Sequence, residues 1–156
     1  MITSFQLSRL IGRIATIQRT LLRLALRESP GIEPEWYYFL HSIADRSEVR
    51  KTDIISYRLI LEPTTGIDIL NRMIRAGLLE ERPDPQDGRA RLLRLTKKGT
   101  STLNKAQQQA QKIAHLLYGD DSMPPTINML EEIEKTFSRI LTEQKPRTFS
   151  QLTSAL

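Results

Sequence analysis

Residues 82–99 read Arg-Pro-Asp-Pro-Gln-Asp-Gly-Arg-Ala-Arg-Leu-Leu-Arg-Leu-Thr-Lys-Lys-Gly, and this stretch decides the fold. Asp87-Gly88 lies between two short runs of extended character, and an Asp-Gly pair in that setting is a strong signal for a β-hairpin. Thr96 follows the second run and is a suitable N-cap for a helix. The stretch therefore predicts a basic hairpin that leads into a long helix.

Two short helices joined by a turn are predicted immediately before this hairpin. Thr52 can cap the first of them, and Pro63 then disfavours helical geometry in Glu62, so a turn is expected there. Thr64 or Thr65 can cap the second helix.

The second helix is expected to end at Gly77, where a left-handed C-cap residue is wanted. Its expected core-facing residues are Ile67, Leu70 and Ile74, which recur at helical spacing. Two helices with a tight turn form a helix-turn-helix, and a basic hairpin directly after one is the layout of a winged helix.

Helical patterns flank this unit on both sides. Residues 34–45 predict a helix, and the helix that begins after Thr96 is followed by a last one over about residues 127–143. The first helix, from about Phe5 to Arg27, could pack inside its own chain or against a partner chain, and its pattern leaves both alternatives open. Its apolar seam is Leu7, Leu10, Ile14, Ile17, Leu21 and Leu24.

Composition sets the class of protein. A chain of 156 residues suits one domain, and 39% apolar with 26% charged residues is typical of a globular protein. Cysteine is absent, and His41 and His115 lie 74 residues apart, so neither disulfides nor a metal site is expected. No apolar stretch is long enough for a membrane span and no secretory signal is evident, so a cytoplasmic location is expected.

The net charge of +5 favours a polyanionic partner, and its distribution is more informative than its size. Residues 1–29 carry five Arg against one Glu, and residues 63–99 carry eight basic against five acidic groups. Positive charge therefore gathers in the first helix and in the segment that holds the helix-turn-helix and the hairpin.

This order of elements resembles the MarR (multiple antibiotic resistance regulator) family of bacterial transcription factors over about residues 5–143. The resemblance is sharpest in Asp87-x-Arg89 at the wing tip and Leu95-Thr96-x-x-Gly99 at the entry to the next helix. Residues 71–80 are similar to the end and exit of that family's recognition helix. The resemblance implies a mainly α fold with a small β-hairpin wing (α+β).

The resemblance also implies an organisation and a function. It implies a single domain, with a DNA-reading lobe over about residues 34–95, helices for dimerisation over about 5–28 and 97–143, and an unassigned tail at 144–156. The expected function is that of a homodimeric regulator of transcription, acting as a repressor on a pseudo-palindromic site in double-stranded DNA.

The expected DNA contacts lie in the second helix of the helix-turn-helix and in the wing. Asn71 has the donor and acceptor pair that suits adenine, and Arg72 has the fork that suits guanine or phosphate. Arg89 is expected in the minor groove, with Asp87 holding it in place. The full set is Thr64, Thr65, Gly66, Asp68, Asn71, Arg72, Arg75, Asp87, Arg89, Arg91 and Lys97.

The resemblance further implies a small aromatic or phenolic effector, for which the candidate residues are Arg13, Trp36, Tyr37 and His41. The alternative is that Trp36 belongs to the core and that Tyr37 and His41 lie at an interface or on the surface. No cofactor is expected.

Two other functions are an enzyme and a protein-interaction module. An enzyme is not expected, because the sequence holds no nucleophile, metal-binding or acid–base constellation. The alternative that stays open is a winged helix that serves as a protein-interaction or dimerisation module and does not bind DNA. The wing separates the two, because an interaction module has no need of Asp87-x-Arg89 among clustered basic residues.

Overall fold

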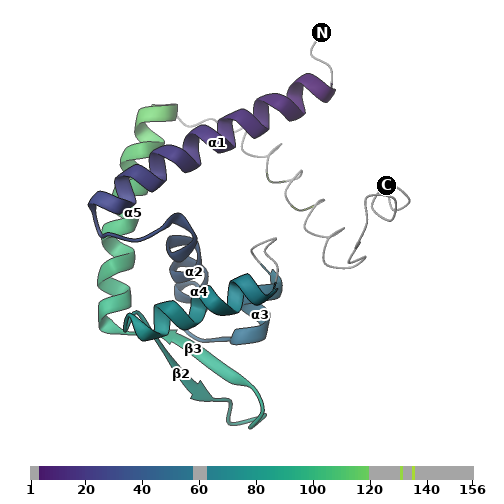
Figure 1. The fold of residues 1–156 in the computed structure, drawn as a ribbon, viewed down its shortest axis with the longest axis vertical. Helices are drawn as coiled ribbons and strands as arrows, with labels where there is room; N and C mark the ends of the chain where they lie inside the picture. Colours follow the sequence, from purple (N-terminus) through teal and green to yellow (C-terminus); the bar gives the residue numbers. More distant parts are fainter. Residues whose placement is uncertain (1–3, 58–62, 120–130, 132–134, 136–156) are drawn as a thin grey trace. The chain divides into compact units, whose positions relative to one another are not determined.

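The structure is a computed structural model that describes residues 4–57, 63–119, 131 and 135 (Figure 1). The chain divides into a unit of residues 1–119 and a unit of residues 120–156. The helix expected over residues 127–143 and the tail at 144–156 lie almost wholly outside the described residues.

The first unit contains helices and short strands in the order that the sequence predicts, with one strand added. The helices are α1 (Ser4–Glu28), α2 (Pro34–Ala44), α3 (Lys51–Tyr57), α4 (Pro63–Arg75) and α5 (Lys97–Tyr118). The strands are β1 (Val49–Arg50), β2 (Leu79–Pro83) and β3 (Arg91–Leu95). Among the described residues, no helix is both long and apolar enough to cross a lipid bilayer.

The predicted hairpin is present. Strands β2 and β3 pair antiparallel, from Leu79 opposite Leu95 to Pro83 opposite Arg91. β1 pairs with the other edge of β3, with Val49 opposite Leu93. The sequence analysis missed β1, because two residues are too few to show a strand period.

The core lies where α2, α4 and the sheet meet the ends of α1 and α5. Phe39, Leu40 and Ile43 of α2 are almost completely buried, and so is Leu93 of the sheet. The remaining buried apolar residues are Leu22, Leu26, Ile32, Val49, Ile54, Ile69, Leu70, Met73, Leu78, Leu79, Leu103 and Ala106.

The predicted seam of α1 is largely uncovered within the chain. Leu10, Ile14 and Ile17 are between 42% and 50% exposed, and Leu24 is 58% exposed. α1 reaches the core through residues 22 and 26 instead, on a different side of the helix. Of the two alternatives that the sequence left open, packing of this seam inside its own chain is not what the described residues show.

The core face of α4 differs from the prediction. Ile67 is 41% exposed, whereas Ile69 is buried beside Leu70 and Met73. The prediction for Ile67 was wrong, because residues 66, 69, 70 and 73 form a continuous buried stripe on a helix, and Ile67 lies outside it. Periodicity alone did not determine which of the two isoleucines, 67 or 69, faces α2 and the sheet.

Candidate nucleic-acid interface

One side of α4 is exposed and polar, as a reading helix requires. The exposed side chains are Thr65, Asp68, Arg72 and Arg75. Gly66 is buried on the stripe that faces the core, and its contact with DNA stays a prediction. The side chain of Thr64 lies outside the described residues.

Asn71 lies on this side of α4, and its amide is held by a neighbour. The Nζ atom of Lys51, at the start of α3, donates to Oδ1 of Asn71 at 2.8 Å and lies 3.4 Å from Oε1 of Glu81 on β2. The ammonium therefore links both helices of the helix-turn-helix to the wing. Lys51 could not be predicted from the sequence, because its partners lie 20 and 30 residues away along the chain.

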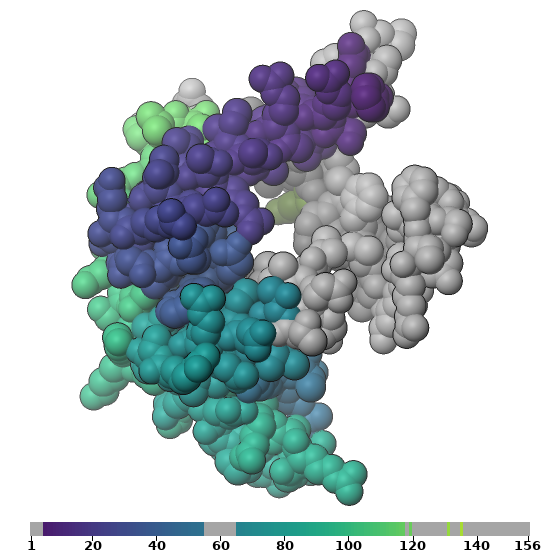
Figure 2. All heavy atoms as spheres, viewed as in Figure 1, coloured from purple at the N-terminus to yellow at the C-terminus, as the bar shows by residue number. Residues whose placement is uncertain are grey.

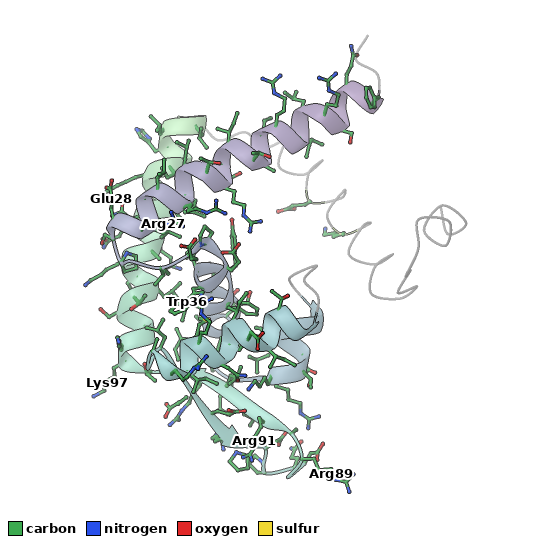
Figure 3. All side chains as sticks on the ribbon, in the orientation of Figure 1. Arg27, Glu28, Trp36, Arg89, Arg91 and Lys97 are labelled. Atoms are coloured by element: carbon green, nitrogen blue, oxygen red, sulfur yellow. The ribbon has the colours of Figure 1, made fainter. Side chains whose placement is uncertain are left out.

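Arg72 lies over an aromatic ring. Its guanidinium carbon is 5.7 Å from the ring centroid of Trp36 on α2, which is within the range of a cation–π interaction. Trp36 also packs against the core. Figure 3 shows Trp36 beside α4, and its contact with Arg72 joins the exposed side of α4 to α2.

The end of α4 is fastened to the start of α5. Gly77 has the positive φ of 72° that its predicted C-cap role requires. The Thr96 hydroxyl donates to the Gly77 carbonyl oxygen at 2.7 Å and accepts from the Gly99 N–H at 3.0 Å. Thr96 therefore caps α5 as predicted and closes α4 as well.

The basic pair at the start of α5 divides into two roles. Lys98 donates to the carbonyl oxygen of Ala76 at 2.8 Å, which satisfies an otherwise open backbone acceptor at the end of α4. Lys97 is exposed and has no hydrogen-bond or ion-pair partner among the described residues. Lys97 is the one of the two that is available to a phosphate.

A buried carboxylate organises the turn of the wing. Oδ1 of Asp84 accepts from the backbone N–H of Gln86 at 2.8 Å, and Oδ2 accepts from Nε of Arg50 on β1 at 2.8 Å. The hydrogen bond from Gln86 holds the pKa of Asp84 below its ordinary value, with a further contribution from Arg50 and an opposing one from burial. Asp87 adds a second hydrogen bond, because its Oδ1 accepts from the backbone N–H of Arg89 at 3.1 Å.

Asp87 was predicted to support the wing, and Asp84 and Arg50 were not predicted from the sequence. Asp87 is exposed and bonds only within the turn, whereas Asp84 is 6% exposed and ties the turn to another strand. The sequence signal for Asp84 was its place between two prolines, Pro83 and Pro85, at the edge of the turn.

The arginines of the wing fall into a paired group and an unpaired group. Arg82 makes two hydrogen bonds to Glu48, at 2.9 and 2.5 Å, and Arg94 donates to Glu80 at 2.6 Å. Arg89 and Arg91 are exposed and have no ion-pair partner among the described residues. The uncompensated charge of the wing is therefore at its tip.

The cations Arg89 and Lys97, unpaired within the described residues, lie at exposed positions on the surface of the lobe. Figure 3 shows Arg89 at the far end of the wing with its side chain directed away from the ribbon, and Lys97 at the first turn of α5. In Figure 2 the tip of the wing stands clear of the helices around it. A flexible cationic side chain on such a projection can enter a groove of nucleic acid.

The four effector candidates do not form one site. Tyr37 and His41, whose rings lie edge to face with centroids 6.1 Å apart, line a cavity of about 460 Å³ between α1, α2 and α5. Trp36 packs behind Arg72 instead. Arg13 lies in a separate, open depression on α1 with Thr16 and Ile17, and it does not line the cavity, which α1 reaches at Gln18 and Leu22.

The cavity has both apolar and polar walls, and its apolar part is formed by Leu22, Ala110, Ile113 and Ala114. Its walls carry the two phenols of Tyr37 and Tyr38 and the amides of Gln18, Gln107 and Gln111, together with His41. Within the described residues, no cluster of acidic and histidine side chains could hold a metal ion.

The chain is similar to known DNA-binding proteins in sequence and in fold. Residues 34–99 match a family of winged helix DNA-binding domains. A mutant of MarR from E. coli complexed with operator DNA is 21% identical, over 83% of this chain and 92% of that chain, with a TM-score of 0.71. No sequence among curated proteins matches the chain.

Two solved structures from Streptomyces coelicolor are also similar. A MarR family transcriptional regulator in complex with DNA is 19% identical, over 94% of this chain and 92% of that chain, with a TM-score of 0.73. The PcaV transcriptional regulator in complex with its natural ligand is 20% identical, over 85% of this chain and 90% of that chain, with a TM-score of 0.65.

Proposed function

The chain has the winged helix-turn-helix fold of MarR-family regulators, and from this premise we propose that it is a transcription regulator that binds double-stranded DNA. The observation that carries the proposal is Arg89, which is exposed and unpaired at the tip of a wing that Asp84 fastens from within. Around it, the described residues leave Arg91, Lys97 and Arg75 exposed and without ion-pair partners. Repression is the expected direction of regulation.

In this proposal α4 enters the major groove and the wing lies along the neighbouring minor groove. Arg89 would enter the minor groove, where the negative potential is greatest. Arg91 and Lys97 would bind phosphates, and Arg72 would bind guanine or phosphate. Thr65, Asp68, Asn71 and Arg75 would face the base edges. Thr64 and Asp87 stay in the proposed set, Asp87 as a support of the wing.

We infer that the protein acts as a homodimer. The exposed seam of α1 supports this, because apolar side chains at 42–58% exposure along one line of a helix gain most by packing against another chain. Dimerisation through residues 5–28 and 97–143 would leave the lobe at 34–95 free. Two reading helices would then meet half-sites about 34 Å apart on a pseudo-palindromic site.

A small aromatic or phenolic effector fits the cavity beside Tyr37 and His41 better than it fits Arg13 or Trp36. The volume of about 460 Å³ is ordinary for a ligand site, and tyrosine and imidazole rings can stack on an aromatic guest. Binding there would touch α1, α2 and α5 together. A thermal-shift screen with phenolic acids and neutral aromatic compounds would test this part.

The proposal is tested by fluorescence polarisation with duplex DNA from upstream of the protein's own gene. The wild type should bind, and Arg89→Ala should bind at least about tenfold more weakly. Arg94→Ala is the matched control, because it also removes one wing cation but one already paired with Glu80. Equal binding by all three proteins would remove Arg89 from the interface, and no binding by any of them would favour the protein-interaction module.

A further inference from the structure

Lys51 has an unusual place for a lysine beside a DNA-reading surface. Its side chain is only 19% exposed, and its ammonium lies between Oδ1 of Asn71 and Oε1 of Glu81. Glu81 offsets its charge, so Lys51 is a poor counterion for a phosphate. Its position instead bears on the orientation of the Asn71 amide.

An ammonium can only donate hydrogen bonds, so only the carbonyl oxygen of Asn71 can face it. At 2.8 Å this contact fixes which end of the amide points towards α3 and which end points away. Without it, the amide of Asn71 could turn over and present either a donor or an acceptor to a base edge. One lysine thereby removes that ambiguity.

Asn71 is placed where such a choice matters. On α4 it lies one turn after Asp68 and one turn before Arg75, and both of these side chains are exposed. The three residues share the side of α4 that is turned away from the buried stripe. A helix lying in the major groove would present this side to the bases.

We propose that Lys51 is a positioning residue that sets the base preference of Asn71, an inference that rests on the proposed DNA-binding function. With Oδ1 committed to Lys51, Asn71 offers the groove its NH₂ group. Two donors match the N7 and O6 acceptors of guanine, whereas adenine needs an acceptor for its N6 amino group as well. The position that Asn71 reads is therefore guanine, in place of the adenine that the residue type alone suggests.

The test is selection of bound duplexes from a random-sequence pool, followed by sequencing, with wild type, Asn71→Ala and Lys51→Met run in parallel. The wild type should enrich guanine at one position of each half-site. Both variants should lose that preference by about 5- to 150-fold, at the same position and at no other. The double variant should lose no more than either single one.

Two further variants separate orientation of the amide from loss of charge or of fold. Lys97→Met removes one exposed cation that does not contact Asn71, and should weaken binding to all sequences alike. Glu81→Gln leaves the bond between Lys51 and Asn71 in place and should keep the guanine preference, which reports on the site even if Lys51→Met folds poorly.

The contrary outcomes are distinct. Lys51→Met with the wild-type preference, or adenine at the Asn71-dependent position, would overturn the inference while leaving the proposed function intact. Failure of the wild type to enrich any sequence would instead contradict the proposed function itself.

Discussion

The carbonyl oxygen of Leu78 occupies the space in which a Cβ atom on Gly99 would lie. Leu78 is the residue between the Gly77 cap of α4 and the start of β2, so the obstacle is backbone and cannot rotate away. The same oxygen accepts from the N–H of Thr96 at 3.1 Å. Gly99→Ala must therefore push α5 away from the reading lobe.

We expect Gly99→Ala to lower the free energy of unfolding by about 1–3 kcal/mol, as overpacking in a rigid setting does. Urea unfolding followed by circular dichroism measures this. Gly88→Ala is the control, because a Cβ there meets no heavy atom within 4 Å. An equal loss of stability in both variants would show that the contact with Leu78 is not limiting.

Arg89 and Arg91 should contribute to DNA binding in a salt-dependent way. Each is exposed and has no ion-pair partner among the described residues, so its full charge is available to a phosphate. Binding of that charge would release counterions from the DNA. Removing either one should lower the slope of log affinity against log salt by about 1. An unchanged slope in Arg91→Ala would assign that side chain to solvent.

The wing should loosen in acid. The pKa of Asp84 is lowered mainly by the hydrogen bond from the Gln86 N–H, and the pKa of Glu48 is lowered mainly by its hydrogen bonds with Arg82. Ordinary values are 3.8 and 4.5, so the stabilisation is complete above those values and is lost as pH falls towards the lowered ones.

The melting temperature of the wild type should therefore fall on acidification from about pH 5 to about pH 3. Asp84→Asn should have a lower melting temperature at neutral pH and a shallower decline in acid. Asp68→Asn, on the exposed side of α4, serves as the control. The assignment fails if the two asparagine variants follow the same curve.

Trp36 is the single tryptophan of the chain, so its fluorescence reports directly on its contact with Arg72. Arg72→Gln should change the emission of Trp36 in the free protein. The cation–π contact should contribute about 0.5–1 kcal/mol at an exposed site, so the loss of stability should be small. Arg75→Gln, which has no such ring partner in the described part of the chain, should leave the emission as it is.

The exposed seam of α1 gives a test of assembly. Ile14→Glu together with Ile17→Glu should weaken self-association at least about 100-fold, because fully burying one isoleucine contributes about 1.5–3 kcal/mol. Sedimentation velocity measures the oligomeric state. Ser8→Glu, exposed on the other side of α1, should not change it. A wild type that is monomeric at all concentrations would contradict the proposed dimer.

The features that could be predicted from sequence are those set by neighbours along the chain. Gly77 and Thr96 each impose a local backbone geometry, and each does so in the structure. Asp87-Gly88 does lie in a turn, closed by the bond from the Ala90 N–H to the Asp87 carbonyl oxygen, but without the positive φ at Gly88 that a two-residue Asp-Gly hairpin turn has. Local chemistry of this kind placed the C-terminal end of α4, the turn of the wing and the start of α5 before any tertiary contact was known. The predicted cap at Thr64 or Thr65 was wrong, because α4 already begins at Pro63.

The features that escaped prediction depend on contacts between distant residues. Asp84 binds Arg50 and Lys51 binds Asn71, over 34 and 20 residues respectively, and no periodic pattern records either pair. The burial of Ile69 in place of the predicted Ile67 also depends on distant residues, because the position of α2 and the sheet determines which isoleucine is covered. Residue types thus identified the surface of the candidate site but not the contacts that orient it.

Thr96 connects the C-terminal end of α4 directly to the first turn of α5 by hydrogen bonds. Its hydroxyl group bonds to both Gly77 and Gly99. Two residues after Thr96, the ammonium group of Lys98 donates to the carbonyl oxygen of Ala76. If α5 tilts, α4 should therefore move with it as one body, because these hydrogen bonds join the two helix ends directly. A small displacement far along α5 is therefore expected to rotate α4 and the exposed side chains that it carries.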